Sequence, residues 1–207
     1  YNSKVRNKQS WDWHAAGELK RLSECTIGIL GLGRIGTSMA LRAKVFGMKV
    51  LFFDPYVPNG QDKALSIKRC DDLNEMLRKS DVISIHTPLT TETQSLVDKA
   101  FLENMKTSGI IINTARGGIF NLDDIYDGLK RSSIHAIATD VLPIEPPDNS
   151  HPLIKDWLEK KDWINGRLII TPHSAFYNRD SIIELRIKAA EELKRILNNK
   201  KPINQVN

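Results

Sequence analysis

The chain has 207 residues, enough for one large domain or two small ones. Hydrophobic residues make up 41% and charged residues 27%, which is typical of a globular protein, and no apolar run approaches the roughly 20 residues of a membrane helix. The net charge of +5 is spread over short clusters, without a basic helix, zinc-ligand spacing or an aromatic platform, so we expect neither nucleic-acid nor membrane binding. Cys25 and Cys70 show no metal spacing and predict buried thiols, with no metal site.

The first half of the chain predicts a nucleotide-binding unit. Residues 1–22, which contain Trp11 and Trp13, are expected to form an arm or lead-in helix. There follow a strand, the glycine turn G-L-G-R-I-G, a helix and a second strand that ends on an acid; the ranges are 26–30, 31–36, 35–46 and 49–53. This order is typical of dinucleotide-binding units. Gly31 would permit the tight turn, Gly33 would let the backbone approach a pyrophosphate, and Gly36 would let helix and strand pack closely.

Asp54 indicates which dinucleotide is bound. It lies 18 residues after Gly36, where a carboxylate can accept hydrogen bonds from an adenosine ribose. The carboxylate would repel a 2′-phosphate, and no arginine follows it directly, so NAD is favoured over NADP. The alternative is that Asp54 only stabilises a turn before Pro55.

The rest of the chain continues the alternation of strands and helices. Further strands are expected at 82–86, 109–113, 135–140 and 167–171, and further helices at 71–79, with Asp71 as N-cap, and at 98–105, 121–131 and 181–198. The segment from Pro143 to Gly166 is the least regular and holds an amphipathic piece at 153–158. The alternation predicts an α/β fold of the Rossmann type, with a doubly wound parallel sheet.

Three charged or titratable residues follow successive strands, at the edge where such sheets bind ligands. Arg116 can hold a carboxylate and polarise a carbonyl, His173 can exchange a hydroxyl proton, and Glu145 can hydrogen-bond the imidazole and favour its charged form. The set suits hydride transfer to or from a 2-keto or 2-hydroxy acid. The alternatives are a surface ion-pair arginine, a loop carboxylate and a loop histidine with ordinary partners.

The motifs, taken in order, resemble those of the D-isomer-specific 2-hydroxyacid dehydrogenases. They are G-L-G-R-I-G, H-T-P-L-T, N-T-A-R-G-G, D-V-L-P-I-E-P-P and T-P-H-S-A-F, and the resemblance extends from about Leu22 to Asn207. Within that family, A-K-V-F-G, F-F-D-P-Y and P-H-S-A-F-Y are similar to the C-terminal binding proteins, which are NAD(H)-sensing transcriptional corepressors.

The resemblance implies a role for each matching residue. Arg116, Glu145 and His173 match the family's substrate arginine, paired glutamate and acid–base histidine. The positions implied to contact NAD are Gly31, Gly33, Arg34, Ile35, Gly36, Asp54, Thr87, Pro88, Thr93, Thr114, Ala115, Arg116, Asp140, His173 and Phe176. Phe176 stands where the corepressor branch often has tryptophan. The segment between Glu145 and His173 looks longer than is usual in the family, and its residues 156–161 have no assigned role.

The resemblance also implies a second domain, for the substrate, that is largely absent from this chain. We expect residues 1–22 as the arm, 23–180 as the NAD-binding domain and 181–207 as a helix and tail returning toward the substrate domain. Alone, the chain should be catalytically silent and should form a homodimer through this domain. The alternative function is an NAD(H)-responsive corepressor scaffold that binds transcription factors with little turnover. The expected location is the cytoplasm, or the nucleus for a corepressor. The sequence does not name the substrate.

Overall fold

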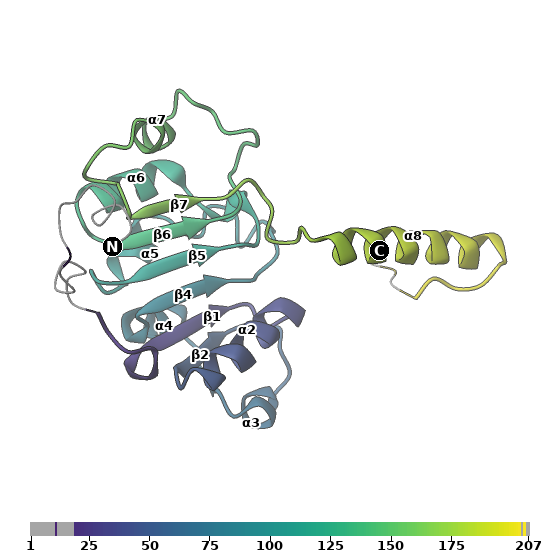
Figure 1. The fold of residues 1–207 in the computed structure, drawn as a ribbon. Helices are drawn as coiled ribbons and strands as arrows, with labels where there is room; N and C mark the ends of the chain where they lie inside the picture. The colour runs from purple at the N-terminus through teal and green to yellow at the C-terminus, as the bar shows by residue number, and fades with distance from the viewer. Residues whose placement is uncertain (1–10, 12–18, 204, 206–207) are drawn as a thin grey trace. The chain divides into compact units, whose positions relative to one another are not determined.

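The computed structural model describes residues 11, 19–203 and 205, and these separate into two compact units. One unit ends at Ile170 and the other begins at Thr171. The first contains a seven-stranded parallel sheet in the order β3-β2-β1-β4-β5-β6-β7, which Figure 1 shows from β7 at the top to β2 near the bottom. The strands are β1 (Thr26–Leu30), β2 (Lys49–Phe53), β3 (Lys68–Arg69), β4 (Val82–Ile85), β5 (Ile110–Asn113), β6 (Ala136–Thr139) and β7 (Leu168–Ile170).

Helices follow most of the strands of this unit. They are α2 (Arg34–Val45), α3 (Gln61–Leu65), α4 (Leu73–Lys79), α5 (Lys99–Glu103), α6 (Leu122–Lys130) and α7 (Pro152–Leu158), with short 3₁₀ turns η2 (Leu22–Glu24) and η3 (Gly117–Ile119). The predicted Rossmann-type parallel sheet is confirmed, and each strand and helix predicted from residue 26 onward lies within three residues of its expected bounds. The arm or lead-in helix expected at 1–22 falls for the most part outside the described residues. The predicted N-cap of α4 is wrong: Asp72, not Asp71, accepts hydrogen bonds from the Asn74 and Glu75 backbone amides.

The sheet is covered on both faces, as the continuous apolar strands predicted. Side chains alternate along β1, so that Ile27 and Ile29 pack in one cluster with Ala40 and Ala43 of α2. Leu30 belongs to the other cluster, which contains Met76 and Leu77 of α4 and the apolar residues of α5 and α6. Two buried cores, one on each face, are therefore what holds the sheet between its helices. Cys25 and Cys70 are buried free thiols, as expected.

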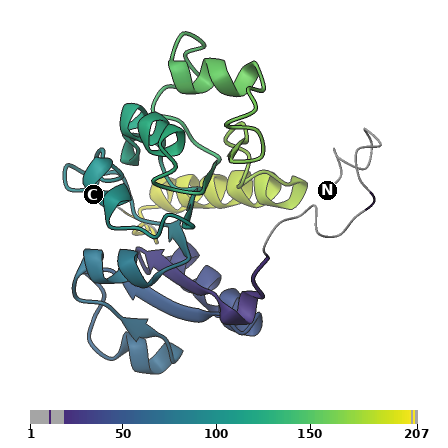
Figure 2. The ribbon, with the colours of Figure 1, turned by 90° about the vertical axis from the view of Figure 1, so that its left-hand side faces the viewer.

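The segment of 156–161, which had no assigned role, is a structural element of the first unit. Helix α7, green at the top of Figure 2, packs against α6 and inserts Leu153 and Ile154 into the core. Asp156 is 6% exposed; its carboxylate binds Lys161 Nζ at 2.7 Å and accepts a hydrogen bond from the Tyr126 hydroxyl at 3.3 Å. Burial would raise the pKa of Asp156, but the hydrogen bond from Lys161 is the larger effect and lowers it. The carboxylate thus stays charged and joins α7 to α6.

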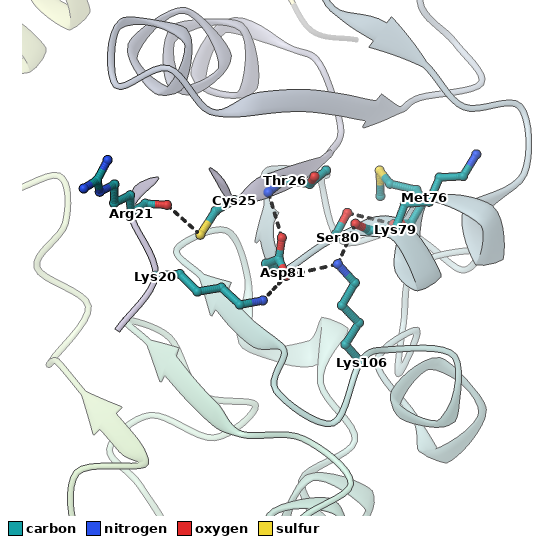
Figure 3. Close-up of polar contacts among 9 residues, drawn as sticks. All are labelled: Lys20, Arg21, Cys25, Thr26, Met76, Lys79, Ser80, Asp81 and Lys106. Carbon is teal, nitrogen blue, oxygen red and sulfur yellow. Dashed lines mark hydrogen bonds and ion pairs between the residues drawn. The ribbon is translucent and has the colours of Figure 1, made fainter. Parts of the chain in front are cut away.

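The amino end of the sheet is joined by Asp81, which precedes β4. Its carboxylate accepts a hydrogen bond from the Thr26 backbone amide at 2.8 Å and binds Lys106 at 3.0 Å and Lys20 at 3.3 Å (Figure 3). Burial alone would raise the pKa of Asp81, but the bonds from Thr26 and Lys106 lower it below its usual value. This carboxylate therefore connects the start of β1 to the segment before β5.

Replacing Asp81 with asparagine is expected to lower the free energy of unfolding by about 2 kcal/mol at pH 7, because a half-buried charge loses charge-assisted hydrogen bonds. Since the pKa of Asp81 is lowered in the folded state, its contribution is present above the ordinary carboxyl pKa and is lost as pH falls through the folded value. Urea unfolding at pH 7 and pH 3 should show the difference between wild type and variant shrinking at pH 3. Asp127→Asn, which removes an exposed pair with Arg131, is the control and should cost less than about 0.5 kcal/mol.

The second unit contains a loop and the helix α8 (Arg179–Leu197). The side chain of Asn178 accepts a hydrogen bond from the Ser181 amide and so caps the start of the helix. Within the described residues of both units, no helix is long and apolar enough to cross a membrane.

Candidate functional site

The glycine turn after β1 has the geometry that its three glycines predicted. Gly31 has φ +88°, and a Cβ there would lie 2.8 Å from the Thr87 backbone nitrogen. A Cβ on Gly36 would lie 2.0 Å from the Gly31 carbonyl oxygen, so only glycine lets α2 start this close to β1. A Cβ on Gly33 would meet nothing within 4 Å. The backbone at Gly33 is therefore open to a ligand, which fits the approach of a pyrophosphate.

A cleft of about 470 Å³ opens beside this turn, at the carboxyl ends of β1, β2 and β4. Its lining includes the predicted cofactor residues Gly31, Gly33, Asp54, Thr87, Pro88 and Thr93. The other contacts predicted in the first unit, which are Arg34, Ile35, Gly36, Thr114, Ala115, Arg116 and Asp140, lie outside this lining. Ile35 is 66% exposed at the start of α2, and Gly36 is buried beneath the turn. The cleft thus gathers residues from three strand ends that are far apart in the sequence.

Asp54 holds the glycine turn in place as well as lining the cleft. Its Oδ2 accepts a hydrogen bond from the Leu32 amide at 2.8 Å, and its Oδ1 accepts one from the Tyr56 amide at 2.9 Å. The hydrogen bond from the Tyr56 amide is the kind of contact expected under the alternative hypothesis, in which Asp54 stabilises a turn at Pro55. Because each carboxylate oxygen can accept more than one hydrogen bond, the same group retains capacity for a ribose hydroxyl.

The loop after β4 shapes the opposite wall of the cleft. Thr93 Oγ1 donates to the Pro88 carbonyl at 2.7 Å and accepts from the Thr90 amide at 2.8 Å, so this hydroxyl closes the loop on itself. His86 lines the cleft, and its Nε2 lies 2.8 Å from Ser84 Oγ. Burial lowers the pKa of His86, which keeps the imidazole neutral at pH 7.

Arg116 follows β5 on a loop that is held by Asn113. The buried Asn113 side chain accepts from the Ala115 amide and donates to the Arg116 carbonyl, each at 3.0 Å. The Arg116 side chain is exposed, and its Nη1 donates to the Ala115 carbonyl at 2.7 Å. Thr114 is exposed and Ala115 half-buried beside it. The sequence indicated the arginine, but not the amide that fixes its backbone.

The loops after β5 and β6 are packed directly on each other. A Cβ on Gly117 would lie 1.9 Å from the Leu142 carbonyl carbon, so that position admits only glycine. A Cβ on Gly118 would lie 2.9 Å from the Leu89 side chain of the cleft loop. Sequence reasoning did not assign a role to this glycine pair; its signal was two adjacent glycines immediately after Arg116. The pair brings the Arg116 loop against two neighbouring loops.

Glu145 and Asp140 lie after β6. Asp140 is 4% exposed, and its amide donates to the Asn113 carbonyl at 2.9 Å, next to the Arg116 loop. Glu145 is exposed, and its Oε1 accepts a hydrogen bond from the Leu142 amide at 2.8 Å, which closes the D-V-L-P-I-E loop. Arg116 and Glu145 therefore stand on loops that are in contact through Gly117 and Leu142.

His173 and Phe176 belong to the second unit. The His173 backbone has φ 49°, and its amide donates to the Thr171 carbonyl at 3.0 Å. The His173 and Phe176 rings meet edge to face with centroids 6.1 Å apart. The phenyl ring thus lies beside the imidazole within the same loop, while the pairing of His173 with Glu145 stays a prediction.

In a parallel sheet of this kind, ligands bind where the strand order reverses, here between β1 and β4. The cleft and its glycine turn lie at that point. The first unit is therefore a dinucleotide-binding domain of the Rossmann type. A family model described as "D-isomer specific 2-hydroxyacid dehydrogenase, NAD binding domain" matches residues 1–175. The chain belongs to this family and contains its NAD-binding domain, so the expected family and the expected cofactor, NAD, are confirmed.

Individual proteins that are similar to this chain are consistent with its place in this family. The chain is 34% identical over 182 residues to D-3-phosphoglycerate dehydrogenase of Methanocaldococcus jannaschii, covering 88% of the chain and 33% of the relative. It is 35% identical over 185 residues to C-terminal-binding protein 1 of Caenorhabditis elegans, covering 88% and 24%. The crystal structure of D-lactate dehydrogenase from Aquifex aeolicus with NAD and lactic acid is 29% identical, with a TM-score of 0.79, over 96% of this chain and 60% of that one.

The chain is shorter than each of these relatives. It spans a third or less of the curated relatives and about 60% of the solved structure. What the matches share with this chain is its NAD-binding part.

Proposed function

We propose that this chain supplies the NAD-binding half of a D-2-hydroxyacid dehydrogenase, which transfers hydride between NAD(H) and a 2-hydroxy or 2-keto acid. The observation that carries the proposal is the cleft at the carboxyl ends of β1, β2 and β4, bounded by the glycine turn and Asp54. The bound cofactor would supply or accept the hydride. In this proposal residues 23–180 form the NAD-binding domain, and 181–207 return toward a substrate domain.

The residues of the chain fit NAD. The open backbone at Gly33 and the start of α2 suit a pyrophosphate, since helix N-termini favour anions. Asp54 lies at the end of β2, where it would accept hydrogen bonds from the adenosine ribose. The neutral imidazole of His86 adds no charge to the cleft beside it.

Arg116, Glu145 and His173 have distinct roles in the proposed reaction. The guanidinium of Arg116 would bind the substrate carboxylate and polarise its carbonyl. The imidazole of His173 would donate the hydroxyl proton during reduction and accept it during oxidation. Glu145 would hydrogen-bond the imidazole and favour its charged form. Contact between the loops after β5 and β6 supports a shared site for Arg116 and Glu145.

The chain is expected to bind NADH more tightly than NADPH, because Asp54 would repel a 2′-phosphate. Asp54→Asn should lower the ratio of NADH affinity to NADPH affinity by about tenfold. The side-chain oxygen of asparagine would still accept a hydrogen bond from the Leu32 or the Tyr56 amide. Asparagine is the suitable substitution, because alanine would also release the glycine turn. Isothermal calorimetry with both cofactors measures the effect, and Asp127→Asn on α6 is the control for net charge. Equal affinity of the unmutated chain for the two cofactors would contradict the role of Asp54.

A second candidate function follows from the 35% identity to C-terminal-binding protein 1. In that case the domain would be an NAD(H)-responsive scaffold for transcription factors, placed in the nucleus rather than the cytoplasm, with little turnover. The relatives that are named as dehydrogenases favour the first candidate function, that of an enzyme. Assay of a 2-keto-acid panel with NADH, using a protein that joins this domain to its substrate domain, distinguishes the two: no turnover of any member would favour the scaffold.

A homodimer formed through this domain is proposed for either function. Trp11 is 92% exposed, and aromatic side chains of this kind are enriched at interfaces; Trp13 lies outside the described residues. Light scattering at tens of micromolar should give twice the mass of the 23.4 kDa chain. A monomer mass, with and without NADH, would rule the dimer out.

A further inference from the structure

One tyrosine connects two carboxylates across the cofactor cleft. The backbone amide of Tyr56 donates to Asp54 Oδ1 at 2.9 Å, and its phenol donates to Glu92 Oε2. Tyr56 and Asp54 follow β2, whereas Glu92 lies on the loop after β4, and all three line the cleft. The hydrogen bond to Glu92 raises the pKa of the Tyr56 phenol, so the phenol remains the donor at neutral pH. Tyr56 therefore links the Glu92 carboxylate to the loop that carries Asp54.

The lining of this part of the cleft is anionic. Asp54 and Glu92 are its two carboxylates, and the described residues that line it include no lysine or arginine. Arg69 approaches the same loop, but its guanidinium donates to the backbone carbonyls of Asp54, Val57 and Pro58 and lies over the Phe52 ring, 5.1 Å from its centroid. The hydrogen-bond donors of Arg69 are thus occupied by the backbone of the loop, although its positive charge remains. A 2′-phosphate beside Asp54 would face the two carboxylates that line the cleft.

We propose that Glu92, held by Tyr56, is a second residue that selects NAD over 2′-phosphorylated dinucleotides. The inference rests on the proposed cofactor site and adds to it a determinant from the opposite wall of the cleft. Asp54 would act on the ribose directly, whereas Glu92 would act through its charge. A phosphate carries up to two charges at pH 7, so one fixed carboxylate on the wall of the same cleft is expected to change its affinity by roughly five-fold in a partly hydrated site.

The test compares NADH and NADPH binding by calorimetry for the 207-residue chain and three variants. Glu92→Gln removes the charge and keeps an acceptor for the phenol, and we expect the NADH-to-NADPH affinity ratio to fall about five-fold. Tyr56→Phe keeps the charge of Glu92 but removes the hydroxyl that holds its carboxylate in place, so the affinity ratio should fall less than with Glu92→Gln. Glu103→Gln, on α5 outside the cleft, changes the net charge equally and should leave the ratio within two-fold of wild type.

The outcomes separate this inference from the cofactor site. If the unmutated chain binds NADH and Glu92→Gln leaves the ratio unchanged, Glu92 has no part in selection while the site stands. A shift with Glu103→Gln equal to that with Glu92→Gln would assign the effect to net charge, and a larger shift with Tyr56→Phe would assign it to the tyrosine. Failure of the unmutated chain to bind NADH would overturn both the site and the inference.

Discussion

Alanine at position 36 is expected to destabilise the domain severely, whereas alanine at position 33 should leave it folded and remove most of its affinity for NADH. A Cβ on Gly36 would lie 2.0 Å from the Gly31 carbonyl oxygen, which is backbone and cannot turn away. Alanine is favoured over glycine inside a helix by only about 1 kcal/mol, while overpacking of this kind costs about 3 kcal/mol. The clash therefore outweighs the gain in helix propensity, and Gly36→Ala should lower the free energy of unfolding.

Gly33 differs because the space around it is open. A Cβ there would meet no atom within 4 Å, and its φ of −71° suits any residue. Loss of stability should stay below about 1 kcal/mol, the cost of alanine at a helix N-cap. The added methyl group would instead occupy the approach of the pyrophosphate, and NADH affinity should fall by more than about tenfold.

Urea unfolding and calorimetry on the two variants separate folding from binding. A Gly36→Ala variant as stable as wild type would show that α2 does not start against the turn as described. A Gly33→Ala variant with wild-type NADH affinity would place the pyrophosphate elsewhere.

Removal of His173 is expected to have the largest effect on catalysis. In a protein that joins this domain to a substrate domain, His173→Ala should lower kcat for keto-acid reduction by on the order of 100- to 10,000-fold, because general acid catalysis is lost. Arg116→Ala should mainly raise KM and lower kcat/KM, since the arginine would bind the substrate carboxylate. NADH binding should survive in the His173 variant.

Steady-state kinetics with a keto acid that the wild type reduces provide the measurement. The 207-residue chain alone is the reference and should show no turnover, because closure of two domains is needed to exclude water and align the reactants. A His173→Ala variant with wild-type kcat would leave the histidine as an ordinary loop residue. Robust turnover by the chain alone would contradict the need for a substrate domain.

Local patterns were sufficient for six of the seven strands and for the glycine turn. The largely apolar runs at 26–30 and 49–53 coincide with β1 and β2, because strands covered on both faces are nearly continuous in apolar residues. The turn at Gly31 was predictable because a positive φ favours glycine. By contrast β3 was missed: it has two residues, both charged, and pairs at the edge of the sheet.

The sequence by itself determined the family, the cofactor and the order of the motifs, since each is carried by residues close together in the chain. The tertiary structure alone decided which distant residues meet. The Leu142 backbone lies against Gly117, and Glu92 is held by Tyr56, 36 residues away. Asp81 joins strands through Thr26, 55 residues away. Such contacts leave no periodicity in the sequence, because they depend on how the loops at the strand ends are brought together when the sheet assembles.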